Sequence, residues 1–209
     1  CMYETFFGLS DLPFRLTPDP RYLFMSAKHR EAFAHLVYGI SEGSGFVAIT
    51  GEVGAGKTTL VRNLLQKLDA KKVVAAQLVT TQLDAGDILR LVAAAFGVPA
   101  QADKAQTLLA LEAFLVSVSQ QGKRALLIVD EAHNLEWEVL EEIRLLGNLE
   151  NRHGKMLQII LSGQPELDRK LDAPNLPQLK QRIVLRTHLE PFTVKDASDY
   201  IFSRMETAG

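Results

Sequence analysis

The sequence lacks the features that mark secreted and membrane-spanning proteins. It contains one cysteine, Cys1, so no disulfide can form within the chain and no cysteine cluster can bind a metal. No apolar run approaches the roughly 20 residues that a helix needs to cross a bilayer. Residues 2–14 contain no basic segment followed by an apolar stretch, so no signal peptide is predicted. These absences predict a cytoplasmic protein.

An excess of charge of either sign is also missing. The chain has 23 Lys and Arg against 25 Asp and Glu, a formal net charge of −2. No overall field therefore attracts nucleic acid or anionic lipid. Hydrophobic residues make up 47% of the 209 residues, which is enough for a sizeable core. Length and composition predict one α/β domain with a small appendage.

Short apolar runs alternate with helical patterns along the chain. The predicted strands cover residues 45–50, 72–79, 124–130, 156–163 and 182–189. Because these runs are apolar throughout, we expect each strand to be buried on both faces. Helices between the strands imply right-handed crossovers and a parallel sheet with helices on both sides.

Helical spacing of apolar residues predicts the intervening helices. The first, over about residues 27–42, has Phe33, Leu36, Val37 and Ile40 on one face. The other predicted helices follow residue 59, span about 84–96, pass through 108–115 and 140–149, and begin near residue 193.

A glycine-rich loop, "GEVGAGKTT", lies between the first strand and a helix. It matches the pattern G-x-x-x-x-G-K-[ST], whose glycines let backbone N–H groups approach a phosphate. The helix N-terminus adds about half a positive charge. We expect Lys57 to reach the β- and γ-phosphates, Thr58 to offer its hydroxyl to Mg²⁺, and Thr59 to contact the α-phosphate. The alternative, a glycine-rich turn with a chance lysine, is disfavoured by the strand–loop–helix context. The predicted nucleotide-binding residues are Gly51, Glu52, Val53, Gly54, Ala55, Gly56, Lys57, Thr58 and Thr59.

An acidic pair, Asp130 and Glu131, ends the third strand in "ALLIVDEAH". In a parallel sheet this end faces the glycine-rich loop. Asp130 is predicted to hold Mg²⁺ through its water shell, and Glu131 to polarise a water for attack on the γ-phosphate. A water-activating glutamate indicates a hydrolase rather than a small-molecule kinase; the alternative is a solvated acidic pair. His133 is expected to be structural or a sensor rather than a base.

Two further polar residues follow later elements. Gln164, after the fourth strand, is predicted to reach the attacking water or the γ-phosphate, with Ser162 as second choice; the alternative is a turn residue before Pro165. Arg182, where a helix meets the fifth strand, is predicted to stabilise transition-state charge on a neighbouring subunit's nucleotide. The alternative for Arg182 is a surface salt bridge. Arg186 is the second candidate.

The stretches "GEVGAGKTT", "LLIVDEAH", "LSGQPEL" and "QLKQRIVLRTHLEPFT", in this order, resemble an AAA+ ATPase. The opening "MYETFFGLSDLPFRLTPDPRYLF" narrows the resemblance to the general secretion pathway protein A family, with its pilus-assembly and exosortase-associated relatives. The resemblance covers essentially the whole chain. It implies a three-layer P-loop NTPase fold with a parallel five-stranded sheet of order 5-1-4-3-2, a helical lid and ATP-driven oligomers.

The resemblance also implies roles and boundaries. Residues 51–59 would be Walker A, Asp130 and Glu131 Walker B, Gln164 sensor 1 and Arg182 the arginine finger. The expected domains are an N-terminal linker block with the first helix (1–43), the ATPase core (44–191) and the first helix of a truncated lid (192–209). No residue is assigned as the sensor-2 arginine.

Function follows from the same resemblance. It implies a magnesium-dependent ATPase that drives assembly of a bacterial envelope secretion or pilus machine, as a ring-like oligomer at the cytoplasmic face of the inner membrane. Membrane contact would come only through C-terminal segments absent from this sequence. The alternatives are a DNA-binding regulator similar to transposition ATPases, disfavoured by the lack of a basic, aromatic-interleaved stripe, and a nucleotide-dependent scaffold. Adenine is expected against residues 13–20, "PFRLTPDP".

Overall fold

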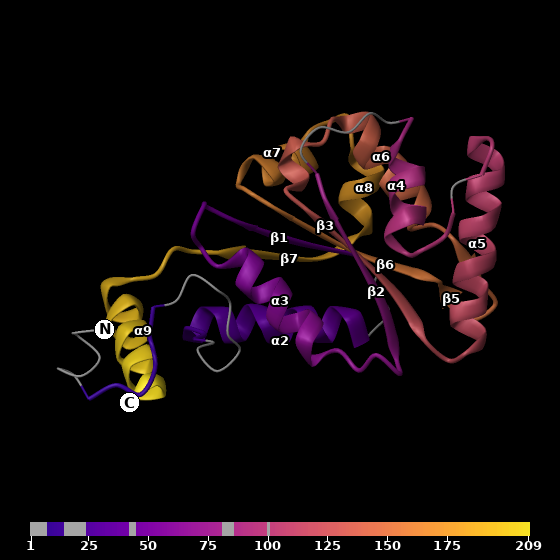
Figure 1. Cartoon of the computed structure of the whole chain (residues 1–209). Coiled ribbons are helices and arrows are strands. Elements are labelled where there is room, and N and C mark those ends of the chain that lie inside the picture. The colour runs from indigo at the N-terminus through magenta and orange to yellow at the C-terminus, as the bar shows by residue number, and fades with distance from the viewer. Residues whose placement is uncertain (1–7, 15–23, 42–44, 81–85, 100) are drawn as a thin grey trace.

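The computed structural model describes residues 8–14, 24–41, 45–80, 86–99 and 101–209 (Figure 1). Its large sheet consists of β1 (Phe46–Gly51), β2 (Val73–Val79), β3 (Arg124–Asp130), β6 (Leu157–Gly163) and β7 (Ile183–Leu189). A two-stranded antiparallel hairpin, β4 (Glu150–Asn151) and β5 (Gly154–Lys155), lies outside it. All neighbouring strands of the large sheet are parallel.

The order of the large sheet is β2-β3-β6-β1-β7. The labels differ from the expected numbering because the hairpin β4–β5, which the sequence did not predict, takes two numbers. When only the strands of the large sheet are counted, the order is 2-3-4-1-5, which is 5-1-4-3-2 read from the other edge. The predicted parallel α/β P-loop fold is confirmed.

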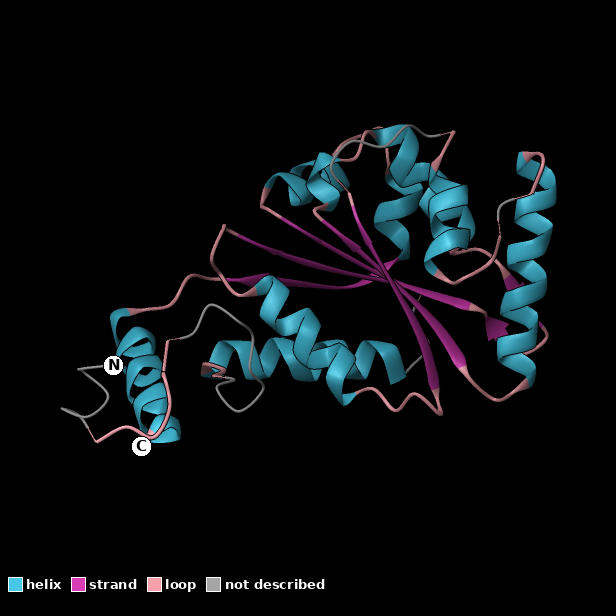
Figure 2. Ribbon diagram, viewed as in Figure 1, coloured by secondary structure: helices cyan, strands magenta, loops and turns pink. Residues whose placement is uncertain are grey.

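Helices cover both faces of the sheet, as Figure 2 shows. They are α2 (Ala27–Ser41), α3 (Lys57–Lys67), α4 (Ile88–Ala95), α5 (Lys104–Gln120), α6 (Trp137–Leu146), α7 (Glu166–Asp172), α8 (Pro177–Arg182) and α9 (Val194–Ala208), with a short 3₁₀ helix, η2 (Ala132–Asn134). Helices α2 and α3 pack on one face and α4 to α8 on the other. Helix α9 lies apart from the sheet, beside the described N-terminal residues, where the Ser10 N–H donates to the Ala208 carbonyl at 2.6 Å (Figure 1).

Two hydrophobic clusters hold these layers together, and the central strands contribute to both. In β3, Leu126 and Ile128 pack with the α2–α3 layer, whereas Leu127 and Val129 pack with the opposite layer. Successive strand side chains point to opposite faces. A strand covered on both faces therefore needs apolar residues at every position, which explains the uninterrupted run "ALLIV" before Asp130.

Three expectations about individual elements need correction. Val37 is 44% exposed, because α2 buries the stripe formed by Ala32, Leu36 and Ile40 instead. The strands β2 and β7 are not buried throughout, because each forms an edge of the sheet and has only one neighbouring strand. The helix expected over 84–96 is α4, which begins at Ile88 after Asp87; residues 81–85 lie outside the described residues.

Gly147, at the end of α6, offers a test of the core. Its φ of −66° suits any residue, but a Cβ there would lie 2.4 Å from Cε2 of the buried Phe46 ring. We expect Gly147→Ala to lower the free energy of unfolding by about 1–3 kcal/mol through overpacking, measured by denaturant titration. Gly45→Ala is the control, since nothing lies within 4 Å of its added Cβ. Equal stability of the two variants would contradict this packing.

Candidate functional site

The glycine-rich loop connects β1 to α3 at the carboxyl edge of the sheet. Gly54 has a φ of 81° and Gly56 a φ of 96°, a left-handed conformation that favours glycine. Gly56 precedes Lys57, the first residue of α3, and offers no side chain to cap the helix. The N–H groups of the first turn therefore point out of the helix end, where they can donate to an anion.

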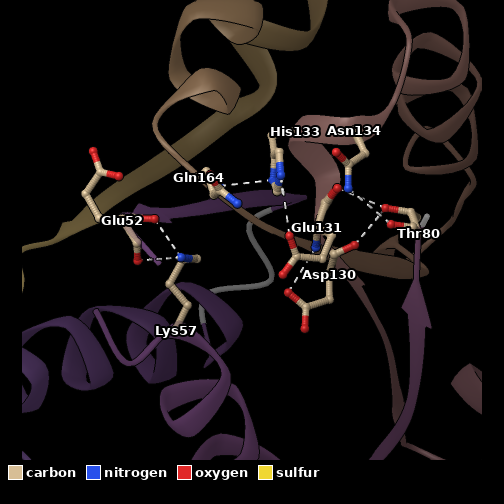
Figure 3. Close-up of polar contacts among 9 residues, drawn as sticks. Glu52, Lys57, Thr80, Asp130, Glu131, His133, Asn134 and Gln164 are labelled. Atoms are coloured by element: carbon tan, nitrogen blue, oxygen red, sulfur yellow. Dashed lines mark hydrogen bonds and ion pairs between the residues drawn. The ribbon is translucent and has the colours of Figure 1, made fainter. Parts of the chain in front are cut away.

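Lys57 is folded back along this loop. Its side chain is buried, and Nζ donates to the carbonyls of Gly51 at 2.6 Å and Glu52 at 3.0 Å (Figure 3). These carbonyls hold the ammonium at the edge where β1 ends. Thr58 and Thr59, next along α3, are exposed. The sequence-predicted phosphate contacts therefore share one loop and one helix turn.

The acidic pair lies at the same edge, at the end of β3 (Figure 3). Asp130 is 7% exposed, and its Oδ1 accepts the N–H of Glu131 at 3.0 Å. Glu131 has a φ of 55°, the one positive value at a non-glycine residue in the described part of the chain. Such a conformation costs about 1–3 kcal/mol and persists only where the surroundings enforce it. The strain is consistent with a functional role for Glu131.

Thr80, which sequence reasoning missed, supports this strained turn. It follows β2, the neighbour of β3, and is fully buried. Its Oγ1 lies 2.8 Å from the Asp130 carbonyl oxygen and 3.0 Å from that of Glu131, and its single hydroxyl proton serves both acceptors. Its position in the sequence could have indicated this role. A small polar residue directly after a predicted strand lies at the carboxyl ends of the strands, where the acidic pair also lies.

His133 connects Glu131 to Gln164, as Figure 3 shows. The Gln164 N–H donates to Nδ1 of His133 at 3.1 Å, and Nε2 of His133 lies 3.4 Å from Oε2 of Glu131. Because Nδ1 accepts a hydrogen bond, the proton of the neutral ring is on Nε2, facing the carboxylate. His133 therefore holds the Glu131 side chain relative to the loop after β6.

Gln164 follows β6 at the carboxyl edge, where the sequence predicted it. The alternative, Ser162, lies inside β6 and is fully buried, and its Oγ has no hydrogen-bond partner among the described residues. A fully buried hydroxyl cannot contact a nucleotide in the present conformation. The geometry therefore favours Gln164 over Ser162.

Arg182 lies far from the glycine-rich loop of its own chain. It ends α8, and Ile183 pairs with Phe46 at the start of β1, whereas Gly51 at the end of β1 pairs with Leu189. Five residues of strand correspond to about 17 Å. Arg182 is exposed at the amino ends of the strands, opposite the carboxyl ends where the glycine-rich loop lies.

The two candidate arginines, Arg182 and Arg186, interact with different carboxylates. The pKa of Glu150 lies below its usual value, mainly because of the hydrogen bond and charge of Lys155, and the Arg182 charge lowers it further. Nη1 of Arg186 donates to Oδ1 of Asp172 at 3.1 Å. Arg186 is therefore already part of an ion pair within the chain.

The residues present fit magnesium beside a nucleotide. Mg²⁺ in such sites takes one or two protein oxygens, the remaining ligands being phosphate and water. The hydroxyl of Thr58, at the start of α3, and the carboxylate of Asp130, at the end of β3, are oxygen groups of this kind. Within the described ranges, no group of three or more His, Cys, Asp and Glu could hold a metal by itself.

The adenine contact expected at residues 13–20 lies mostly outside the described residues. The proposed adenine contact, residues 13–20, is described at Pro13 and Phe14 alone; residues 15–23 lie outside the described residues. Of the helices in the described segments, none is long and apolar enough to cross a membrane.

The sequence of the chain is similar to those of known proteins. Residues 40–171 match the AAA domain family. The whole chain is 45% identical to general secretion pathway protein A from Aeromonas hydrophila and spans 38% of that protein's length.

Solved structures resemble the fold. The ORC2 protein of Aeropyrum pernix, in ADPNP–ADP complexes, superposes with a TM-score of 0.71 at 22% identity, covering 93% of this chain and 55% of its own. Cdc6p from Pyrobaculum aerophilum gives a TM-score of 0.69 at 15% identity, covering 91% and 54% of the two chains. At these identities the likeness concerns the fold alone.

Proposed function

The chain belongs to the AAA domain family, and we propose that it binds MgATP at residues 51–59 and hydrolyses it with Glu131. The observation that carries this proposal is the meeting of two motifs at one sheet edge. The glycine-rich loop with Lys57 ends β1, and Asp130 with the strained Glu131 ends β3. A general base at this edge can act on a water beside a phosphate bound by the loop.

Each residue would have a separate task. Backbone N–H groups of the loop bind the phosphates, and the Lys57 ammonium neutralises charge on the β- and γ-phosphates. Thr58 and Asp130 hold Mg²⁺, which supplies further charge neutralisation when bound. Glu131 accepts a proton from the attacking water.

Two residues beside the acidic pair complete the arrangement. His133, with its Nε2 proton facing Glu131, keeps that carboxylate oriented. Gln164 contacts the water or the γ-phosphate from the end of β6. Release of phosphate from ATP by the purified chain, with and without magnesium, tests the activity; no release in either condition would leave only nucleotide binding.

The relative's name supports a place in secretion. We propose that the ATPase works as a ring-like oligomer at the cytoplasmic face of the inner membrane, in assembly of a secretion or pilus machine. The chain spans 38% of that relative's length, and contacts with envelope components are not assigned to residues of this sequence. Restoration of assembly by the full-length protein, and not by its Glu131→Gln variant, tests this role. A salt-dependent DNA-binding assay tests the DNA-regulator alternative.

Lys57→Ala is expected to weaken ATP binding by roughly 10- to 100-fold, because it removes a charge-assisted contact with the phosphates. Isothermal titration calorimetry measures the change. Lys71→Ala is the control, since Lys71 is an exposed lysine after α3. Unchanged affinity of the Lys57→Ala variant would remove the phosphate-binding assignment.

A further inference from the structure

A histidine of α2, His29, forms a hydrogen bond with the glycine-rich loop. His29 is buried, and its Nε2 lies 2.6 Å from the carbonyl oxygen of Ala55. A carbonyl only accepts hydrogen bonds, so Nε2 carries the proton. Oγ of Ser26 lies 2.5 Å from Nδ1, and in the neutral ring the serine hydroxyl donates to it. Ser26 and Ala55 therefore set both the tautomer and the orientation of the ring.

The ring occupies the space beside Gly56. A Cβ at Gly56 would lie 2.6 Å from Nε2 of His29. Ala55 is fully buried, and without this donor its carbonyl would have no hydrogen-bond partner among the described residues. Buried backbone carbonyls are almost always paired. A loop that turns its N–H groups toward a phosphate leaves such carbonyls to be satisfied by the rest of the protein.

The same ring contacts the segment that leads into α9. Phe192 packs edge-on against His29, with ring centroids 5.3 Å apart and planes at 71°. Phe192 directly precedes Thr193, the residue that caps α9. Tyr200 of α9 lies 6.0 Å from Phe192, and Phe24, before α2, lies 5.7 Å from it. His29 thus contacts both the glycine-rich loop and the segment that leads into α9.

We propose that His29 is a positioning residue that holds residues 51–56 in their phosphate-binding conformation, and that Phe192 couples it to α9. A shift of α9 would move Phe192, release the ring and weaken the hydrogen bond to Ala55. Nucleotide affinity would then depend on the position of α9. This inference rests on the proposed nucleotide binding.

Two substitutions of His29 separate the hydrogen bond from the volume of the ring. His29→Gln keeps an N–H donor near the position of Nε2, whereas His29→Leu keeps apolar bulk without a donor. We expect His29→Leu to bind a fluorescent ATP analogue about tenfold more weakly, the effect of leaving one buried carbonyl unpaired, and His29→Gln to stay within about threefold. KM should rise more than kcat falls, because His29 orients the loop and does not touch the reacting atoms. Equal affinity of His29→Leu and the parent protein overturns the inference.

The coupling to α9 requires a double-mutant cycle. Phe192→Ala should weaken nucleotide binding several-fold in the parent protein and have little further effect in the His29→Leu background. Additive effects would mean that Phe192 acts independently of His29 and would overturn the coupling. Thermal denaturation of each variant checks that it is folded under the binding conditions.

A measurement without nucleotide separates failure of this inference from failure of the proposed function. Long-range ¹H–¹⁵N NMR of the parent protein should show His29 as the Nε2–H tautomer, with a slowly exchanging Nε2 proton whose signal shifts in Phe192→Ala. An Nδ1–H tautomer, or a signal unaffected by Phe192→Ala, overturns the inference even if ATP binds. A parent protein with this NMR signature that binds ATP no better than Lys57→Ala overturns the proposed nucleotide binding, and with it the control of affinity by α9.

Discussion

Glu131→Gln is expected to reduce ATP hydrolysis by about 10²- to 10⁴-fold and to leave ATP affinity within about twofold of the parent value. The amide has the volume of the carboxylate but cannot accept the proton of the attacking water. The left-handed turn at residue 131 and the support from Thr80 do not depend on the carboxylate, so the fold should be retained. Phosphate release at saturating ATP measures the rate, and calorimetry measures the affinity.

Glu138→Gln is a matched control for this substitution. Glu138 is an exposed glutamate in the first turn of α6, seven residues further along the chain. We expect it to hydrolyse ATP at the parent rate. If Glu131→Gln also did so, Glu131 would be a structural residue of the turn after β3, and another base would be required.

Arg182→Ala is expected to lower the rate of hydrolysis by about 10³- to 10⁵-fold, the range measured for an arginine supplied by a neighbouring molecule in related chemistry. Within one chain Arg182 lies at the amino ends of the strands, whereas the glycine-rich loop lies at their carboxyl ends. It can therefore stabilise charge on the γ-phosphate only in a second subunit. The specific activity of the parent protein should rise with its concentration, and Arg182→Ala should abolish that rise without changing ATP affinity.

Mixing variants tests whether the site is shared between subunits. An Arg182→Ala subunit retains Glu131, and a Glu131→Gln subunit retains Arg182, so their mixture should recover part of the activity that each has lost. Arg169→Ala, a change of an exposed arginine on α7, is the control and should behave as the parent protein. No recovery in mixtures shown to co-assemble would place the arginine elsewhere, with Arg186 the next candidate.

Much of the fold was predictable because its signals are local. A strand buried on both faces must be apolar at each position, so the apolar runs that end just before Thr50 and Asp130 identify central strands without any knowledge of their neighbours. The glycine-rich loop is equally local, since two left-handed glycines, a lysine and a helix start lie within a few residues. Connections through helices then require a parallel sheet, and its carboxyl edge must hold both motifs.

Contacts between distant segments were decided by the tertiary structure. Thr80 reaches the turn after Asp130 only because β2 pairs with β3, a residue separation of 50 along the chain. His133 reaches the Gln164 backbone because η2 lies beside the end of β6. No pattern in a single sequence specifies which polar residues will meet in this way. The roles assigned to these residues remain predictions.

The sequence by itself determined the layers of this protein and the loop between β1 and α3, because apolar periodicity and glycine conformations act over a few residues. The tertiary structure decided the surroundings that orient the chemical groups. It gave Glu131 its left-handed φ and exposed one side of β7, an outermost strand of the sheet. It also brought His29 into a hydrogen bond with the Ala55 carbonyl and into contact with the Phe192 ring. These features depend on which segments pack together, and packing is a property of the whole chain.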